Sequence, residues 1–178
     1  MLRGELTLLR ARSVEDARTL HAGLYEDVDT FVRADTRPWM PIPFGPGSPY
    51  WPGEGAPSTA DAAVFAVTEL VSGELAGEAL LWGIDLHNRS AHLGLSLRPA
   101  CRGRGLGEDT VRVLCRYGFA LRGLHRLQLE TLPDNHAMMA AAVRAGFTRE
   151  GTTRGSAWVN GRWMDDVIFG LLDTEFSG

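Results

Sequence analysis

Hydrophobic and polar residues follow two different periods along the chain, and each period predicts a type of element. Residues 5–11 alternate as in a β-strand, and Ser13 followed by acidic residues is typical of a helix start. We expect that helical stretch to continue to about Asp35. The apolar runs within residues 62–97 are separated by short polar turns, which predicts an antiparallel meander of three strands.

From Gly107 the period changes to that of an amphipathic helix. Apolar residues recur three and four positions apart from Val111 to Leu121, with arginines on the other face. Residues 124–131 alternate as in a strand, and the Ala-rich segment that follows ends at Gly146, as expected of a helix C-terminus. Further strands are predicted over residues 147–154 and 162–172.

The segment between the first helix and the meander, residues 36–61, is rich in proline and glycine. It contains seven of the nine prolines of the chain, which excludes a continuous helix or central strand. Loops of this length are uncommon in compact domains unless they bind something or are disordered. Its aromatic residues argue against disorder and suit either the rim of a binding site or a cover over part of the core: Trp39, Phe44, Tyr50 and Trp51.

Composition narrows the classes of protein to consider. With 178 residues, 44% of them hydrophobic, the chain can bury one substantial core, so we expect a single domain over residues 1–178. A formal net charge of -4 disfavours nucleic-acid binding, because Lys and Arg contacts to phosphates supply most of that affinity. No apolar run reaches the roughly 18 residues of a membrane span, so we expect no membrane partner.

The cysteines give no sign of a metal site or a disulfide framework. Cys101 and Cys115 form no CxxC pair, and no cluster of histidines accompanies them. We therefore expect no metal and a reducing, cytoplasmic environment. Cys115 falls within the predicted helix and is interpreted as a small packed hydrophobic residue.

A basic, glycine-rich turn lies between the meander and the helix that follows it. The sequence from Arg102 to Gly107 is RGRGLG. Free N–H groups and the helix dipole attract anions to a helix N-terminus, and glycine lets a phosphate approach the main chain closely. The turn therefore predicts a phosphate-binding site, although a flexible turn with helix-capping glycines has the same sequence pattern.

Other phosphate-binding motifs do not fit this turn. A P-loop requires Lys and then Ser or Thr, but Gly107 is followed by Glu108 and Asp109. A dinucleotide-binding fingerprint needs a further glycine where Glu108 stands, and it lies early in a parallel unit. RNA-binding RGG segments are repetitive and disordered, whereas this turn is single and lies between ordered patterns.

With these motifs excluded, the chain resembles the GCN5-related N-acetyltransferase (GNAT) superfamily over essentially its whole length. The family signature R/Q-x-x-G-x-G/A is matched in register by Arg102, Gly105 and Gly107. The segment NGRWMDDVIFGLL is similar to the closing strands of the branch that contains ribosomal-protein N-terminal acetyltransferases. Other matches are Asn135, the AGF sequence of residues 145–147, and the EG pair of residues 150–151.

The resemblance implies a fold and a donor site. The fold is a mixed, mostly antiparallel sheet of six to seven strands, flanked by helices and split between its fourth and fifth strands, with acetyl-CoA in the cleft. Main-chain groups of Leu95, Ser96 and Leu97 would pair with the pantetheine amides, and the Leu95 N–H would also stabilise the oxyanion of the thioester. The pyrophosphate would contact Arg102, Gly103, Arg104, Gly105, Leu106 and Gly107, while Asn135 and Met138 would line the pantetheine or adenine side.

The implied reaction is direct attack on the thioester by a primary amine of a protein N-terminus or a small molecule. We interpret His92 as the catalytic base, because it lies on the predicted fourth strand where relatives often carry Glu, and histidine titrates near neutral pH. A surface role for His92 stays open, and Glu78 and Asp85 are the next candidates. Ala142 stands where many relatives carry the Tyr that protonates the departing thiolate, so no Tyr acid is assigned there.

Several readings stay open at this point. One is a catalytically silent acyl-CoA-binding module that regulates a partner, and another is a transferase that uses succinyl-CoA or another acyl-CoA. A homodimer is also compatible with the family. The acidic residues of the early helices either attract a cationic amine or form a solvated face: Glu26, Asp27, Asp29 and Asp35. Asp165 and Asp166 of the last strand either contact an acceptor or pair with an Arg.

Overall fold

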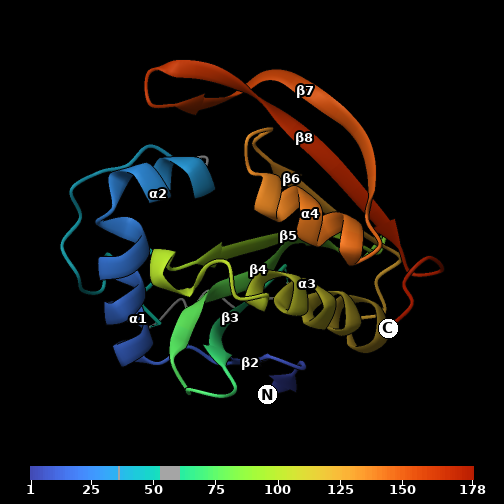
Figure 1. The fold of residues 1–178 in the computed structure, drawn as a ribbon, viewed down its shortest axis with the longest axis horizontal. Coiled ribbons are helices and arrows are strands. Elements are labelled where there is room, and N and C mark those ends of the chain that lie inside the picture. The colour runs from blue at the N-terminus through green and yellow to red at the C-terminus, as the bar shows by residue number, and fades with distance from the viewer. Residues whose placement is uncertain (36, 53–60) are drawn as a thin grey trace.

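The structure is a computed structural model that describes residues 1–35, 37–52 and 61–178. Within these ranges one eight-stranded sheet, in the order β1-β2-β3-β4-β5-β6-β8-β7, forms the centre of the molecule (Figure 1). Neighbouring strands are antiparallel except β5 and β6, which are parallel. The predicted mixed, mostly antiparallel fold is confirmed, and the strand number exceeds the predicted six to seven because Leu2–Arg3 adds a short edge strand.

The strands and helices follow the periods of the sequence closely. The strands are β1 (Leu2–Arg3), β2 (Thr7–Arg10), β3 (Ala62–Glu69), β4 (Leu75–Asp85), β5 (Ser90–Leu97), β6 (Arg126–Thr131), β7 (Thr148–Val159) and β8 (Arg162–Leu172). The α-helices are α1 (Val14–Leu20), α2 (Val28–Ala34), α3 (Leu106–Arg116) and α4 (His136–Arg144). A 3-10 turn (Pro99–Cys101) precedes α3, and π-helical turns follow α1 (His21–Tyr25) and α3 (Tyr117–Leu121).

The main core lies between the sheet and the helices α3 and α4. Its buried residues come from the inward-facing positions of the central strands and from one face of each helix, which explains the helical period of the sequence. Leu81, Leu114 and Leu127 are completely buried in it. Figure 1 shows α3 and α4 side by side in front of the sheet. The predicted packing role of Cys115 agrees with its complete burial in this core.

The first helical stretch is interrupted, unlike the continuous helix that the sequence predicts. Ser13 caps α1 in a reciprocal capping box with Asp16, as the sequence indicates. The chain then leaves the helix at Asp27, whose backbone is extended and whose side chain accepts from the N–H of Thr30 to begin α2. A second cap, two residues after the end of a π-helical turn, therefore divides the stretch in two.

A second, smaller core holds α1, α2 and the described part of the Pro-rich segment together. Tyr50 is buried against Tyr25 with ring centroids 6.4 Å apart, and the Trp39 indole N–H donates to the Tyr25 carbonyl at 2.9 Å. Phe44 and Trp51 pack edge to face. The described aromatic residues thus cover a core, while residues 36 and 53–60 of the predicted loop lie outside the described residues. In the part of the chain that the structure describes, no helix is long and apolar enough to cross a bilayer.

Candidate active site

The sheet is divided at β5. Strand β4 pairs with β5 as far as Leu97, but β6 pairs with β5 only from Ser90 to His92. Residues 93–97, here called the open edge of β5, therefore have no strand partner on the β6 side among the described residues. Helix α3 begins shortly after this edge, so the predicted split lies where β5 runs towards the glycine-rich turn.

The hydrogen-bond pattern shows which main-chain groups point away from β4. The Arg98 N–H donates to the Ala76 carbonyl at 2.8 Å, which makes these residues a hydrogen-bonded pair. Such pairs alternate along an antiparallel ladder, so Ser96 also directs its main-chain groups towards β4. Leu95 and Leu97 therefore direct their N–H and C=O groups towards the open edge, as expected for groups that would bind an extended chain.

The start of α3 lies against the same part of β5. Gly105 is the N-cap, with φ of 79° in the left-handed region that favours glycine, and α3 begins at Leu106. The first N–H groups of a helix have no partner within it, so the first turn of α3 offers several free donors. A Cβ on Gly107 would lie 3.6 Å from the Leu95 side chain, which shows how closely helix and strand approach.

Asp109 holds this helix start in position. Its buried carboxylate accepts hydrogen bonds from the main-chain N–H groups of Glu5, Leu6 and Thr7 and from the Thr7 hydroxyl, at 2.6 to 3.1 Å. The β1–β2 turn is wrapped so tightly that a Cβ on Gly4 would lie 2.2 Å from the carboxylate. In the sequence, Asp109 served only to exclude a P-loop. Its position in the first turn of the predicted helix is the signal that could have indicated a structural role at the helix start.

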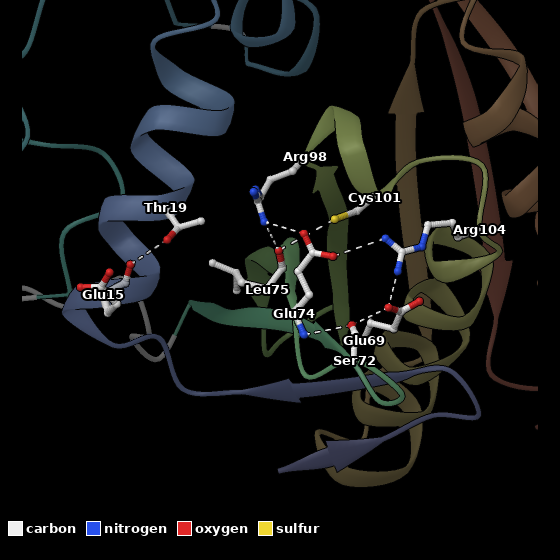
Figure 2. A network of polar contacts seen from close by, with 9 residues as sticks. All are labelled: Glu15, Thr19, Glu69, Ser72, Glu74, Leu75, Arg98, Cys101 and Arg104. Carbon is white, nitrogen blue, oxygen red and sulfur yellow. Dashed lines mark hydrogen bonds and ion pairs between the residues drawn. The ribbon is translucent and has the colours of Figure 1, made fainter.

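The arginines of the glycine-rich turn are already engaged. Arg104 forms ion pairs with Glu69 and, at 3.5 Å, with Glu74, both near the β3–β4 turn. Figure 2 shows the Glu74 carboxylate between Arg104 and Arg98, whose guanidinium lies 3.4 Å from it. Arg102 donates from Nε to the Leu97 carbonyl at 3.0 Å. Arg102 therefore stands at the open edge, whereas the Arg104 guanidinium is directed towards the carboxylates near the β3–β4 turn.

Three other residues of this neighbourhood have structural roles. Asn135 caps α4, and its side-chain oxygen accepts from the Met138 N–H at 3.2 Å. Met138 packs against the main core. Cys101 is buried next to the Leu75 carbonyl, and burial raises the pKa of its thiol, so it is held as a neutral thiol near Arg98.

His92 lies on the opposite face of the sheet from the Leu95 side chain, because side chains alternate along a strand. Its Nδ1 is 3.1 Å from Oε1 of Glu130 on β6, and its ring stacks on Trp82 with centroids 4.3 Å apart. His92 is the last residue of β5 that pairs with β6, so it stands where the open edge begins. We call this side of the sheet the His92 face.

Glu78 lies on the same His92 face, directly opposite Ser96 in the β4–β5 register. Its carboxylate pairs with Arg12 at 2.5 Å, and Arg12 also donates to the Tyr50 carbonyl at 3.0 Å. Burial raises the pKa of Glu78, and the nearby Arg12 partly offsets this effect. Ser96 comes four positions after His92 on β5, and Glu78 lies opposite Ser96. His92 and Glu78 are therefore about 13 Å apart along the strands.

The remaining candidate base serves the β4–β5 turn. Asp85 accepts from the N–H groups of His87 and Asn88 and from the Asn88 side chain, and these hydrogen bonds lower its pKa. It is therefore a turn residue with a fully ionised carboxylate. Ala142, at the position of the expected Tyr, is completely buried in the main core.

Most acidic residues of the early helices and last strand have local partners. Asp29 accepts from the Asn160 side chain at 2.9 Å, which links α2 to the β7–β8 turn, and Asp35 pairs with Arg37. Asp165 and Asp166 accept from the Gly155 N–H and the Ser156 hydroxyl across the irregular part of β7. Glu26 lies 3.7 Å from His21. These contacts give the acidic residues local hydrogen-bond or ion-pair partners at the surface.

A split sheet with a helix start at its open edge is the arrangement of a GNAT-type acetyltransferase fold, and sequence comparison agrees. The family model for the acetyltransferase (GNAT) domain matches residues 6–148. The chain belongs to this family. The superfamily membership expected from the glycine-rich turn is thereby confirmed.

Individual relatives show how far the likeness extends. The putative ribosomal N-acetyltransferase YdaF of Bacillus subtilis (strain 168) is 32% identical over 109 residues, which are 61% of this chain and 60% of that protein. The probable N-acetyltransferase YjcK of the same organism is 31% identical over 87 residues, 49% of this chain and 48% of that protein. The matched part thus spans about half to two thirds of the length of these relatives.

Solved structures share the fold at low identity. Spermidine N-acetyltransferase from Vibrio cholerae, in complex with CoA and spermine, superposes with a TM-score of 0.80 at 21% identity, over 97% of this chain and 99% of that one. A probable acetyltransferase gives 0.79 at 23% identity, over 97% of this chain and 96% of that one. These likenesses establish the architecture across nearly the whole chain.

Proposed function

We propose that this protein transfers an acetyl group from acetyl-CoA to a primary amine by direct attack of the amine on the thioester. The observation that carries the proposal is the open edge of β5, which directs the main-chain groups of Leu95 and Leu97 towards a helix start with free N–H groups. An extended amide chain fits such an edge as an added strand would. A pyrophosphate fits the helix N-terminus beyond it.

The residues present fit this donor. The N–H groups at the start of α3 and the side chains of Arg102 and Arg104 would hold the pyrophosphate, and Gly103 and Gly105 already adopt the left-handed conformation that brings main chain to the surface. The remaining contacts that we propose are Leu106, Gly107, Asn135 and Met138, together with the side chain of Ser96, whose main-chain groups are directed towards β4. The Leu95 N–H is proposed to stabilise the oxyanion, since it points into the open edge.

The acceptor amine is proposed to approach from the His92 face. Once the ammonium has lost one proton, its nitrogen forms a bond to the acyl carbon, the carbon–sulfur bond breaks, and the sulfur leaves as a thiolate. Water gives a proton to this thiolate, and the resulting hydroxide takes the second proton from the acylated nitrogen, which leaves a neutral amide. The ammonium proton of the acceptor passes to His92, whose Nε2 has no hydrogen-bond partner among the described residues. Water protonates the thiolate in this scheme because Ala142 offers no acidic group.

We propose two acceptor classes: a ribosomal amine such as a protein N-terminus, because YdaF is named a putative ribosomal N-acetyltransferase, and a polyamine, because the Vibrio cholerae enzyme is named for spermidine. Both present a primary amine. The acidic groups Glu78 and Glu130 on the His92 face suit a cationic acceptor of either class.

Thiol release from acetyl-CoA, measured with peptides, polyamines and aminoglycoside-like amines, tests the proposed function. We expect release that depends on both substrates and a mass gain of one acetyl group on the amine. Tight CoA binding with no release on any amine would instead indicate a silent binding module. Faster release from succinyl-CoA than from acetyl-CoA would show that the donor is a different acyl-CoA.

A further inference from the structure

A row of polar side chains on β6 leads to His92. Arg126, Gln128 and Glu130 alternate along the strand, so their side chains lie on one face. Arg126 Nη2 donates to the Gln128 oxygen at 3.1 Å, and the Gln128 amide nitrogen donates to Glu130 Oε1 at 2.6 Å. The same Glu130 oxygen is 3.1 Å from His92 Nδ1. Each member of the row therefore fixes the orientation of the next.

The imidazole ring is held on three of its sides. Trp82 covers one ring face, with an interplanar angle of 20°, and Glu130 occupies Nδ1. A Cβ on Gly83 would lie 3.4 Å from His92 Cδ2, so the main chain also limits the ring on that edge. The His92 side chain is still 33% exposed, and its Nε2 has no hydrogen-bond partner among the described residues.

We infer that Glu130 is a positioning residue, whose carboxylate keeps the proton of neutral His92 on Nδ1 and so leaves Nε2 as the atom that receives the proton of the acceptor amine. This inference rests on the proposed acetyl transfer for its chemical role. The reason is that an ionised carboxylate can only accept a hydrogen bond, so Nδ1 must be the donor. Once His92 is protonated, the negative charge of Glu130 stabilises the imidazolium.

The substitution Glu130→Gln separates the effect of the Glu130 charge on His92 from the contribution of the side chain to packing. Glutamine keeps the shape of the side chain, but it lacks the negative charge and can present its NH2 group to Nδ1. The ring would then place its proton on Nε2, where it can no longer accept one. A comparable change of tautomer in a Ser-His-Asp triad lowers turnover about 10⁴-fold, so a loss of at least about 100-fold is expected here.

The chain offers a matched control. His125, the residue just before β6, also faces a carboxylate through Nδ1, at 2.9 Å from Oδ1 of Asp173. The first residue pair between the two strands is Ser90 with Arg126, at the opposite end of β5 from the open edge. His125 comes just before Arg126, so the His125–Asp173 pair lies away from the open edge. Asp173→Asn therefore removes the same kind of contact from a histidine that the proposed reaction does not use.

Imidazole nitrogen NMR and steady-state kinetics on wild type, E130Q, D173N, H92A and the double variant H92A/E130Q provide the test. We expect E130Q to move the His92 proton from Nδ1 to Nε2, lower kcat at least about 100-fold, and change the KM for acetyl-CoA less than about twofold. The double variant should be no slower than H92A, because Glu130 acts through His92. D173N should alter the His125 signals alone and leave kcat unchanged.

An unchanged His92 tautomer in E130Q, or additive losses in the double variant, would overturn the inference. A large kcat loss in D173N would do the same, because it would show that the effect is not specific to His92. Failure of the proposed function looks different: wild-type protein would release no thiol with any amine. The NMR comparison would then still decide whether Glu130 sets the tautomer.

Discussion

The two sides of β5 are built in different ways. Most of the proposed donor site comes from one continuous stretch, residues 95–107, to which the start of α4 adds Asn135 and Met138, and it relies mainly on main-chain groups and backbone conformation. The His92 face is assembled from side chains on four separate elements. Arg12 follows β2, Glu78 lies on β4, His92 on β5 and Glu130 on β6.

This difference shows where each kind of specificity resides. The positions of main-chain groups depend on strand register and turn geometry. Many side chains are therefore compatible with the donor site, and its glycines are the residues that the family signature specifies. The His92 face depends on the identity of each side chain and on the packing that brings distant segments together. Single substitutions should therefore separate the two sides cleanly: donor affinity on one, stability and acceptor chemistry on the other.

The largest effect should come from breaking the Arg12–Glu78 pair. The Arg12 side chain is 3% exposed and that of Glu78 16% exposed, so Arg12→Ala leaves a buried carboxylate without its partner. We expect a loss of about 3 to 5 kcal/mol in the free energy of unfolding, measured with urea at pH 7. Protonation of Glu78 at acidic pH removes the buried charge, so the loss in the free energy of unfolding should become smaller there.

A double variant, Arg12→Met with Glu78→Leu, is the control for this prediction. Replacing both members of a buried pair by apolar residues is often neutral for stability, so most of the loss should be recovered. Its turnover also compares the two candidate bases. Activity within a few-fold of wild type would support His92 over Glu78, whereas a stable but inactive double variant would assign the base to Glu78.

A smaller effect concerns Asp16 at the start of α1. Burial alone would raise its pKa, but hydrogen bonds from Arg10 and Ser13 outweigh burial and lower the pKa to about 2, from 3.8. A depressed folded pKa means that this carboxylate adds stability above about pH 4, and that the contribution is lost as the pH falls towards 2. After allowance for screening through the partly exposed Arg10, it amounts to about 1 to 2 kcal/mol.

Urea titrations of Asp16→Asn and wild type at several pH values test this. The variant should be less stable at pH 7, and the difference should shrink steadily between pH 4 and pH 2. A difference that stays constant over that interval would show that the ionised carboxylate is not the source of the stability.

The smallest effect is expected on the donor side. Glu69 and Glu74 compete with a bound pyrophosphate for Arg104, so Glu69→Gln should free this guanidinium and remove a repulsive charge. An exposed pair of this kind contributes up to about 1 kcal/mol, which corresponds to at most about a fivefold gain in CoA affinity. Calorimetry at low and high salt measures it. Weaker binding by the variant would show instead that Glu69 orients Arg104 productively.

The donor side could be predicted from sequence because its information is local. The glycine-rich turn, the periodic helix after it and the meander before it occupy adjacent segments, and the family signature falls within them. The split also follows the prediction, since β6 leaves β5 after His92. Local patterns of this type depend on backbone preferences that act within a few residues.

The His92 face was predicted only in part. His92 and Glu78 were named, but their partners Glu130 and Arg12 lie 38 and 66 residues away in sequence, and no spacing pattern connects them. The interruption of the first helix at Asp27 was also missed, because helical period alone does not show a second cap. Tertiary packing decides such features, so a single sequence carries little signal for them.

Calorimetric titration of CoA into Gly105→Glu most directly tests the claim that the main chain between β5 and α3 holds the donor. Gly105 has φ of 79°, and a glutamate there would place strain and negative charge at the helix start. The control is Gly123→Glu, which introduces the same residue at a glycine with φ of 64° in open space before β6. We predict at least about 100-fold weaker binding to Gly105→Glu and unchanged binding to Gly123→Glu. Equal affinity in both folded variants would contradict the assignment of the donor site.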